Sequence, residues 1–251
     1  MREATNSSED GLEAACRWIL VILAHACQPH FVRQTAHVGR RHNSVIKTAP
    51  PKTRNRMANK AASDHRGKAQ PVCQHNVDLC RESVASETAK DQIGVWEDIN
   101  NAFQVLRVKN TFEDETGDDT AGMQQIIVNV LLEPKACGGQ LPLTYGELVK
   151  SIGFQDAVES IRALSKAGNS VGNTFEKAVA LFRVMAGEEA GGEVVSLADE
   201  PVRLVVEIQL HLQHYIAERK KTHLWFKVDR ADRLEHLQRD CAAYRNTLPS
   251  G

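Results

Sequence analysis

The sequence predicts an α/β (α+β) fold in which a mixed β-sheet is flanked by helices, and three observations support this. Alternating or β-branched apolar runs of strand length recur along the chain, at residues 76–84, 105–108, 126–132 and 202–208. Segments with apolar residues at helical spacing lie between them, at residues 89–103, 148–167 and 174–186. The connections range from a short loop to a long helical segment, which predicts both parallel and antiparallel pairing.

Composition is ordinary for a globular protein, but charge is unevenly distributed. The chain has 251 residues, 42% hydrophobic and 25% charged, with a formal net charge of -1. Ten Lys or Arg residues stand against one acid within residues 28–70, whereas residues 113–119 hold five acids and no base. A basic segment of this kind indicates a phosphate-rich partner or a disordered arm.

The N-terminal fifth of the chain differs from the rest in the spacing of its apolar residues. Residues 11–27 have the pattern of a short helix, but residues 28–53 contain Pro50-Pro51 and scattered bases without periodicity. We therefore expect residues 1–50 to form a basic, partly disordered arm that contributes little to the core. Residues 51–251 are expected to form the domain, with residues 135–201 as a helical insertion.

The cysteines and the apolar run near the N-terminus bear on the compartment. None of the six cysteines belongs to a Cys-x-x-Cys pair, which disfavours a zinc site or a disulfide framework and favours a reducing, cytoplasmic location. Residues 18–24, followed by Ala-His-Ala, have the outline of a signal-peptide core. The acidic residues before this run favour instead an amphipathic or core helix, too short to span a membrane.

Two carboxylates stand in or just after apolar strands, far apart in sequence. Asp78 lies in the first predicted strand, and Glu207 is expected where the last strand ends and a helix over residues 209–219 begins. A carboxylate in such a place is costly unless a metal or hydrogen bonds receive it. If the two strands are neighbours, the pair suits divalent-cation binding, or a ligand plus a general base, for phosphoryl or nucleotidyl transfer. The alternative is that Glu207 and Gln209 lie on the solvated face of an edge strand.

Basic residues precede these strands at regular spacing. A helix over residues 54–62 would bring Arg56 and Lys60 onto one face, either around an anion or as a solvated surface. Glycine-rich dinucleotide and P-loop motifs are absent from the sequence, as are serine and cysteine nucleophile signatures.

The order of these pieces resembles the RelA/SpoT-type synthetase domain, in particular its divergent protist and microbial forms. The resemblance covers roughly residues 51–230 and rests on six segments in order: the bases Lys52, Arg54 and Lys60; Asp-Leu-Cys-Arg-Glu-Ser-Val at 78–84; Arg-Val-Lys-Asn-Thr-Phe at 107–112; Ile-Val-Asn-Val at 127–130; Val-Glu-Ile-Gln-Leu-His-Leu at 206–212; and Lys-Thr-His at 221–223.

The resemblance implies a nucleotidyltransferase-like sheet and transfer of pyrophosphate from ATP to the 3′ hydroxyl of a guanosine nucleotide. It makes Asp78 the Mg²⁺ ligand and Glu207 the second catalytic and metal-binding carboxylate. The nucleotide-binding residues that follow from it are Lys52, Arg54, Lys60, Arg81, Lys109 and Gln209.

The acceptor loop departs from that family. Gly122-Met123 stands where the family has a Gly-Tyr pair whose ring stacks on the acceptor base, and the acidic run precedes this loop. Two hypotheses follow. One is a pyrophosphokinase or nucleotidyltransferase that uses ATP and Mg²⁺ on a nucleotide or RNA hydroxyl; the other is an inactive descendant that binds nucleotide or RNA as a regulatory module. The sequence leaves the oligomeric state open and predicts no membrane partner.

Overall fold

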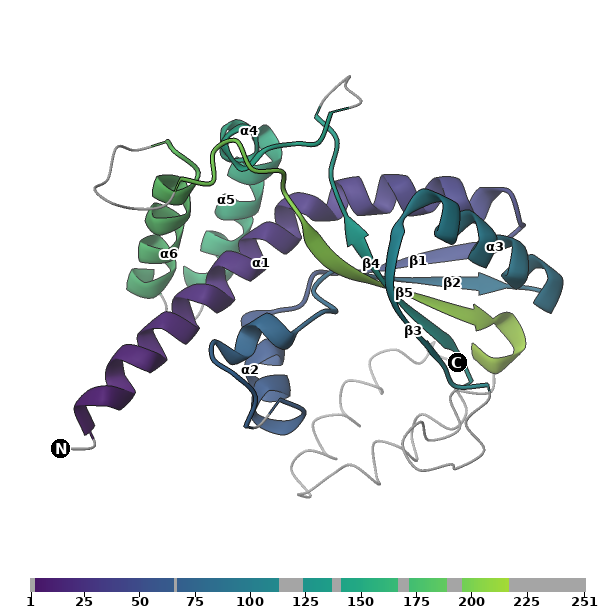
Figure 1. Cartoon of the computed structure of the whole chain (residues 1–251), viewed down its shortest axis with the longest axis horizontal. Coiled ribbons are helices and arrows are strands. Elements are labelled where there is room, and N and C mark those ends of the chain that lie inside the picture. The colour runs from purple at the N-terminus through teal and green to yellow at the C-terminus, as the bar shows by residue number, and fades with distance from the viewer. Residues whose placement is uncertain are drawn as a thin grey trace, which may run out of the picture.

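The computed structural model describes residues 3–65, 67–112, 124–136, 141–166, 172–188 and 196–216. They form one five-stranded mixed sheet and six α-helices (Figure 1). The fold class predicted from the sequence is confirmed. No helix within these residues is long and apolar enough to cross a membrane.

The sheet has the strand order β1-β2-β5-β4-β3. Strands β2 and β5 pair in parallel and the other neighbours pair antiparallel. The strands are β1 (Val45–Ala49), β2 (Arg81–Ser86), β3 (Gln104–Asn110), β4 (Ile126–Leu132) and β5 (Leu204–Leu212). Because β5 is the central strand, the alternative that placed Glu207 on an edge strand is wrong.

The basic N-terminal segment does not behave as an arm. Residues 3–40 form the long helix α1 (Glu3–Arg40), and residues 45–49 form the edge strand β1 paired with β2. Trp18, Ile22 and Phe31 of α1 are buried in the core. The prediction that residues 1–50 contribute little to the core is therefore wrong. Polar residues at the contact between helix and sheet interrupt the apolar spacing that would have indicated a core helix. They find partners inside the protein, as when Gln28 Nε2 donates to the Ala49 carbonyl at 3.2 Å.

One face of the sheet is apolar and is covered by α1 together with α3 (Ala89–Ala102). Val84, Val128 and Ile208 are fully buried on this face. Gly39 lets α1 approach β1 closely, because a Cβ at this position would lie 2.5 Å from Ile46 Cδ1. The opposite face carries Arg81 of β2, Asn129 of β4 and Glu207 of β5, whereas Glu82 of β2 is buried on the apolar side.

Residues 135–201 connect β4 to β5 and contain the three helices α4 (Tyr145–Lys150), α5 (Ile152–Lys166) and α6 (Gly172–Met185). The helix expected at residues 148–167 is divided at Ser151, whose Oγ accepts from the Phe154 backbone N–H at 3.1 Å. Figure 1 shows α5 and α6 beside the N-terminal half of α1, away from the sheet, and these helices contact each other. Trp18 and Phe175 meet edge to face at 5.1 Å.

Two strand boundaries differ from the sequence prediction. The first strand begins at Arg81 because residues 72–75 form a short 3₁₀ helix, η1 (Val72–His75), and residues 76–80 run as a loop. The last strand continues to Leu212, so Gln209 lies in a strand and not in a helix. The basic residues after Thr53 form α2 (Arg54–Ser63) as expected. The end of the helix expected over residues 209–219 and the Lys-Thr-His segment at 221–223 lie outside the described residues.

Candidate functional site

Asp78 lies in the loop before β2 and is held by two lysines. Lys52 Nζ donates to both carboxylate oxygens of Asp78 at 2.7 Å, and Lys60 Nζ lies 3.2 Å from Oδ2. The Lys52 backbone N–H donates to the Leu79 carbonyl at 2.9 Å, which fixes the residue beside this loop. Lys60 comes from α2, which Thr53 caps by accepting from the Arg56 N–H. Local hydrogen bonds therefore bring both cations to one carboxylate.

The charges of this cluster are largely shielded from water, since the Lys52 and Asp78 side chains are 8% and 10% exposed. Burial alone would raise the pKa of Asp78, but the hydrogen bonds and charges of Lys52 and Lys60 outweigh it and lower that pKa. Burial also lowers the pKa of Lys52, against the attraction of Asp78. Asp78 is thus an ionised carboxylate in a cationic pocket.

Glu207 occupies the middle of the central strand and is held from its own strand and from its neighbours. Its backbone N–H donates to the Cys80 carbonyl at 3.0 Å, and Gln209 Nε2 donates to Glu207 Oε1 at 2.7 Å. In the sheet register it pairs with Arg81 of β2 and with Asn129 of β4. Directly paired residues share a face of the sheet, so these three side chains lie in one row.

Glu207 and Asp78 lie close enough to interact electrostatically. Burial is the main cause that raises the pKa of Glu207, and the negative charge of Asp78 adds to it. Gln209, Arg81 and Lys60 act in the opposite direction. The two carboxylates therefore differ: the pKa of Asp78 is lowered and that of Glu207 is raised, so Glu207 is the better proton acceptor of the two.

Of the remaining residues predicted at the site, one lies on the same sheet face, one contacts a different part of the protein, and two lie outside the described residues. Lys109 lies on β3, on the same sheet face as Gln209, because both align with Ile127 in the register. Arg54, expected to contact a triphosphate, instead lies over the Trp18 ring of α1 at 5.3 Å. Gly122 and Met123, the acceptor loop, lie outside the described residues.

One residue of the polar row, Asn129, was missing from the site residues predicted from the sequence. Asn129 pairs with Glu207 on one side and with Arg107 of β3 on the other. The signal was present, because Asn129 is the one polar residue in the apolar run 126–132. A polar residue inside such a strand is costly unless a partner receives it.

The residues present suit a magnesium ion only together with a phosphate ligand. The described residues contain no group of three or more His, Cys, Asp or Glu side chains placed to hold a metal. Mg²⁺ in nucleotide sites commonly uses one or two carboxylates and completes its shell with phosphate oxygens and water. Asp78 and Glu207 supply such a pair, and the two lysines on Asp78 are suited to the same phosphates.

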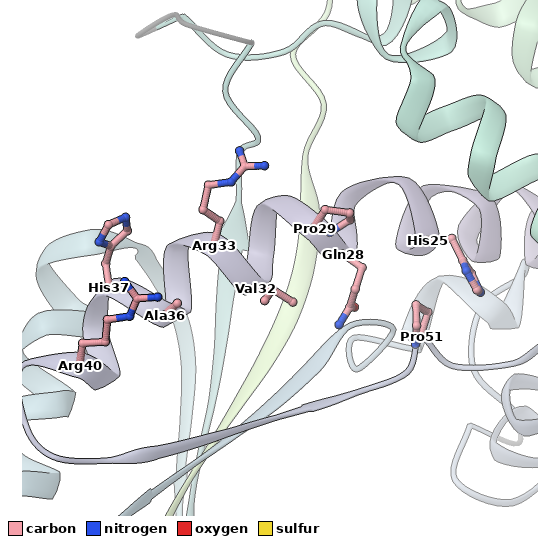
Figure 2. A pocket seen from close by; sticks show the side chains of 9 residues that line it. All are labelled: His25, Gln28, Pro29, Val32, Arg33, Ala36, His37, Arg40 and Pro51. Atoms are coloured by element: carbon pink, nitrogen blue, oxygen red, sulfur yellow. The ribbon is translucent and has the colours of Figure 1, made fainter.

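A second basic region follows the exposed side of α1. A cavity of about 650 Å³ runs along this helix and is lined by His25, Arg33, His37 and Arg40 among others, whose side chains are drawn in Figure 2. A second cavity of about 960 Å³ shares Arg33 and His37 and reaches Lys150 at the end of α4. Arg33 and Arg40 are exposed and have no ion-pair partner in the part of the chain that the structure describes.

Comparison with known proteins gives distant structural likenesses. No protein-family model matches the chain, and no curated protein sequence does. The structure is similar to that of a GTP pyrophosphokinase family protein from Streptococcus pneumoniae, with 10% identity and a TM-score of 0.41, over 84% of this chain and 80% of that one. It is also similar to small alarmone synthetase 1 from Bacillus subtilis bound to its product pppGpp, with 11% identity and a TM-score of 0.38, over 86% of this chain and 90% of that one.

Proposed function

We propose that this chain is an ATP-dependent pyrophosphokinase of the RelA/SpoT-like type. The observation that carries the proposal is the pairing of a lysine-bound Asp78 with a central-strand Glu207 of raised pKa on one polar face of a mixed sheet. Lysines beside a carboxylate can exchange that partner for a triphosphate when Mg²⁺ neutralises part of the phosphate charge. A buried glutamate of raised pKa can take a proton from a hydroxyl.

Each residue has a defined role in the proposed transfer. Lys52 and Lys60 bind and orient the phosphates of ATP, and Asp78 with Glu207 holds Mg²⁺. Glu207 accepts the proton of the acceptor hydroxyl while Gln209 fixes the orientation of its carboxylate. The hydroxyl oxygen bonds to the β-phosphorus, the bond from that phosphorus to the oxygen bridging it to the α-phosphorus breaks, and AMP leaves.

A transfer assay tests the proposal directly. The chain would be incubated with ATP labelled at the γ-phosphate, Mg²⁺, and a panel of ribonucleotides and RNA. Transfer of label to an acceptor together with release of AMP is expected, and Glu207→Gln should lower the rate by at least about a hundredfold, as for loss of a general base. Label found only in inorganic phosphate, or a Glu207→Gln variant as active as wild type, would contradict the proposal.

The α1 surface favours a second candidate function, a catalytically inactive module that binds nucleotide or RNA. Arg33 and Arg40 on this helix are exposed next to a cavity, and no described residue forms an ion pair with them. The pairing of both Asp78 oxygens with lysines also completes that cluster without a metal. Under this candidate, Arg33→Ala with Arg40→Ala abolishes polyanion binding and no acceptor becomes labelled.

A further inference from the structure

Asn129 carries a hydrogen-bond donor that has no partner among the residues that the structure describes. The residue is 5% exposed, and its Nδ2 atom has no hydrogen-bond acceptor. An unpaired buried donor destabilises a fold, whereas an apolar side chain of the same size would not. The neighbours of Asn129 along β4, Val128 and Val130, are fully buried valines. These valines face the other side of the sheet, so Asn129 is a buried donor on the polar face, where a ligand that accepts a hydrogen bond would satisfy it.

The place of Asn129 in the sheet specifies what that ligand presents. Asn129 and Glu207 are direct partners on adjacent antiparallel strands, so their Cβ atoms lie about 4.5–5.5 Å apart on one face. Glu207 accepts hydrogen bonds and Asn129 Nδ2 donates them. A proton acceptor and a proton donor side by side complement two neighbouring hydroxyl groups, one that gives its proton and one whose oxygen receives a hydrogen bond.

The strand beyond Asn129 adds positive charge. Arg107 pairs with Asn129, and Lys109 lies two residues further along β3 on the same face. Adjacent strands lie about 4.8 Å apart, so Arg107 is two strand spacings from Glu207, roughly 10 Å. A molecule with neighbouring hydroxyls at Glu207 and Asn129 would thus place an anionic group within reach of Arg107 and Lys109.

We propose that Asn129 determines specificity for a phosphorylated ribonucleotide acceptor, by donating a hydrogen bond from Nδ2 to the ribose hydroxyl next to the one that Glu207 deprotonates. This rests on the proposed function, which makes Glu207 the proton acceptor. The 2′ hydroxyl is the group by which a protein distinguishes ribonucleotides from deoxyribonucleotides. Asn129 therefore excludes acceptors that lack one of the two hydroxyls.

Binding and transfer measured together test the proposal. GDP and 2′-deoxy-GDP would be titrated into the full chain in the presence of Mg²⁺ and a non-hydrolysable ATP analogue, and both would then be used as acceptors with labelled ATP. Wild type should prefer GDP by about tenfold, as for one hydrogen bond. Asn129→Leu should bind both nucleotides equally and should unfold at a temperature a few degrees higher, because an unpaired buried amide has been removed.

The matched control is Gln104→Leu, the same amide-to-leucine change on the same sheet face but at an exposed position of β3. It should leave the preference for GDP unchanged. Asn129→Val is the second variant, since valine suits a strand interior if leucine packs poorly.

The outcomes separate this inference from the proposed function. Loss of the ribose preference in Asn129→Leu without any transfer by wild type supports the role of Asn129 and refutes the pyrophosphokinase. Transfer that does not distinguish GDP from 2′-deoxy-GDP, or a variant that keeps the preference, overturns the inference and leaves the enzyme intact. Failure of wild type to bind either nucleotide overturns it as well, and so does a large fall in the stability of Asn129→Leu and Asn129→Val, because it would show that the amide supports the fold.

Discussion

At the scale of single residues, Glu207 couples the site to the stability of the fold. Its folded-state pKa lies above the ordinary value of 4.5, chiefly because of burial. The folded protein therefore binds more protons than the unfolded chain above pH 4.5, and unfolding becomes easier as the pH rises. The stabilisation from the neutral acid is complete below pH 4.5 and is lost as the pH rises through the raised pKa.

Glu207→Gln should remove this part of the pH dependence and should make the metal-free protein more stable than wild type at neutral pH. Urea denaturation at several pH values between 4.5 and 7.5 measures it. Glu97→Gln, at an exposed position of α3, is the matched control. A variant whose stability falls with pH as steeply as that of wild type would contradict the environment described for Glu207. Some decline should remain in the variant, because burial also raises the pKa of Glu82.

Lys52 provides the second test at this scale. Lys52→Met removes two hydrogen bonds to a largely buried carboxylate and leaves Asp78 with Lys60 alone. The expected loss is about 1.5–3 kcal/mol in the free energy of unfolding, as for a hydrogen bond to a charged group. Asp78→Asn in the same background should recover part of it, and the exposed Lys90→Met should cost little. Equal effects of Lys52→Met and Lys90→Met would show that the ion pair contributes nothing.

The sequence predicted some of these residues and missed others for physical reasons. Asp78 and Glu207 stood out because a carboxylate in an apolar run needs a partner, and Lys60 because of helical spacing. For Arg54 the basic spacing did not reveal that the guanidinium lies over the Trp18 ring, and its contact with a triphosphate stays a prediction. A role for Asn129 can be inferred only from the strand register, because its pairing with Glu207 is what brings the two side chains together.

At the scale of elements, α1 is the part that sequence reasoning misjudged most. The helix packs on α5 and α6 in its N-terminal half and on α3 and the sheet further along, so no single apolar stripe runs along its length. Buried polar residues such as Thr35, whose Oγ1 donates to the Phe31 carbonyl at 2.9 Å, mask the pattern further. By contrast, β4 was predicted with the correct bounds because it is β-branched and apolar nearly throughout.

Phe31→Ala in α1 should therefore cost about 3–5 kcal/mol in the free energy of unfolding, as for other buried aromatic residues. Leu12→Ala in the same helix should cost far less, because Leu12 is 60% exposed. Chemical denaturation of both variants gives the comparison. Similar, small losses for the two would restore the interpretation of this segment as a dispensable arm.

At the scale of the whole molecule, the parallel pairing of β2 with β5 is what assembles the site. It brings the loop that carries Asp78 beside the middle of β5, although Asp78 and Glu207 lie 129 positions apart in sequence. The sequence predicted a mixed sheet, and it brought Asp78 and Glu207 together only on the condition that their strands are neighbours. It could not give the strand order, because residues 135–201 separate β4 from β5 in the chain while the two strands pair directly.

Calorimetric titration of the full chain with a non-hydrolysable ATP analogue, with and without Mg²⁺, tests most directly whether this assembly is a nucleotide site. The account predicts Mg²⁺-dependent binding that Asp78→Asn largely removes in a variant that remains folded. It also predicts that saturation with the analogue at about 100 times its Kd adds about 2.7 kcal/mol to the stability of wild type. Absence of binding, or binding that depends neither on Mg²⁺ nor on Asp78, would contradict the assignment of Asp78, Lys52, Lys60 and Glu207 as the ATP site.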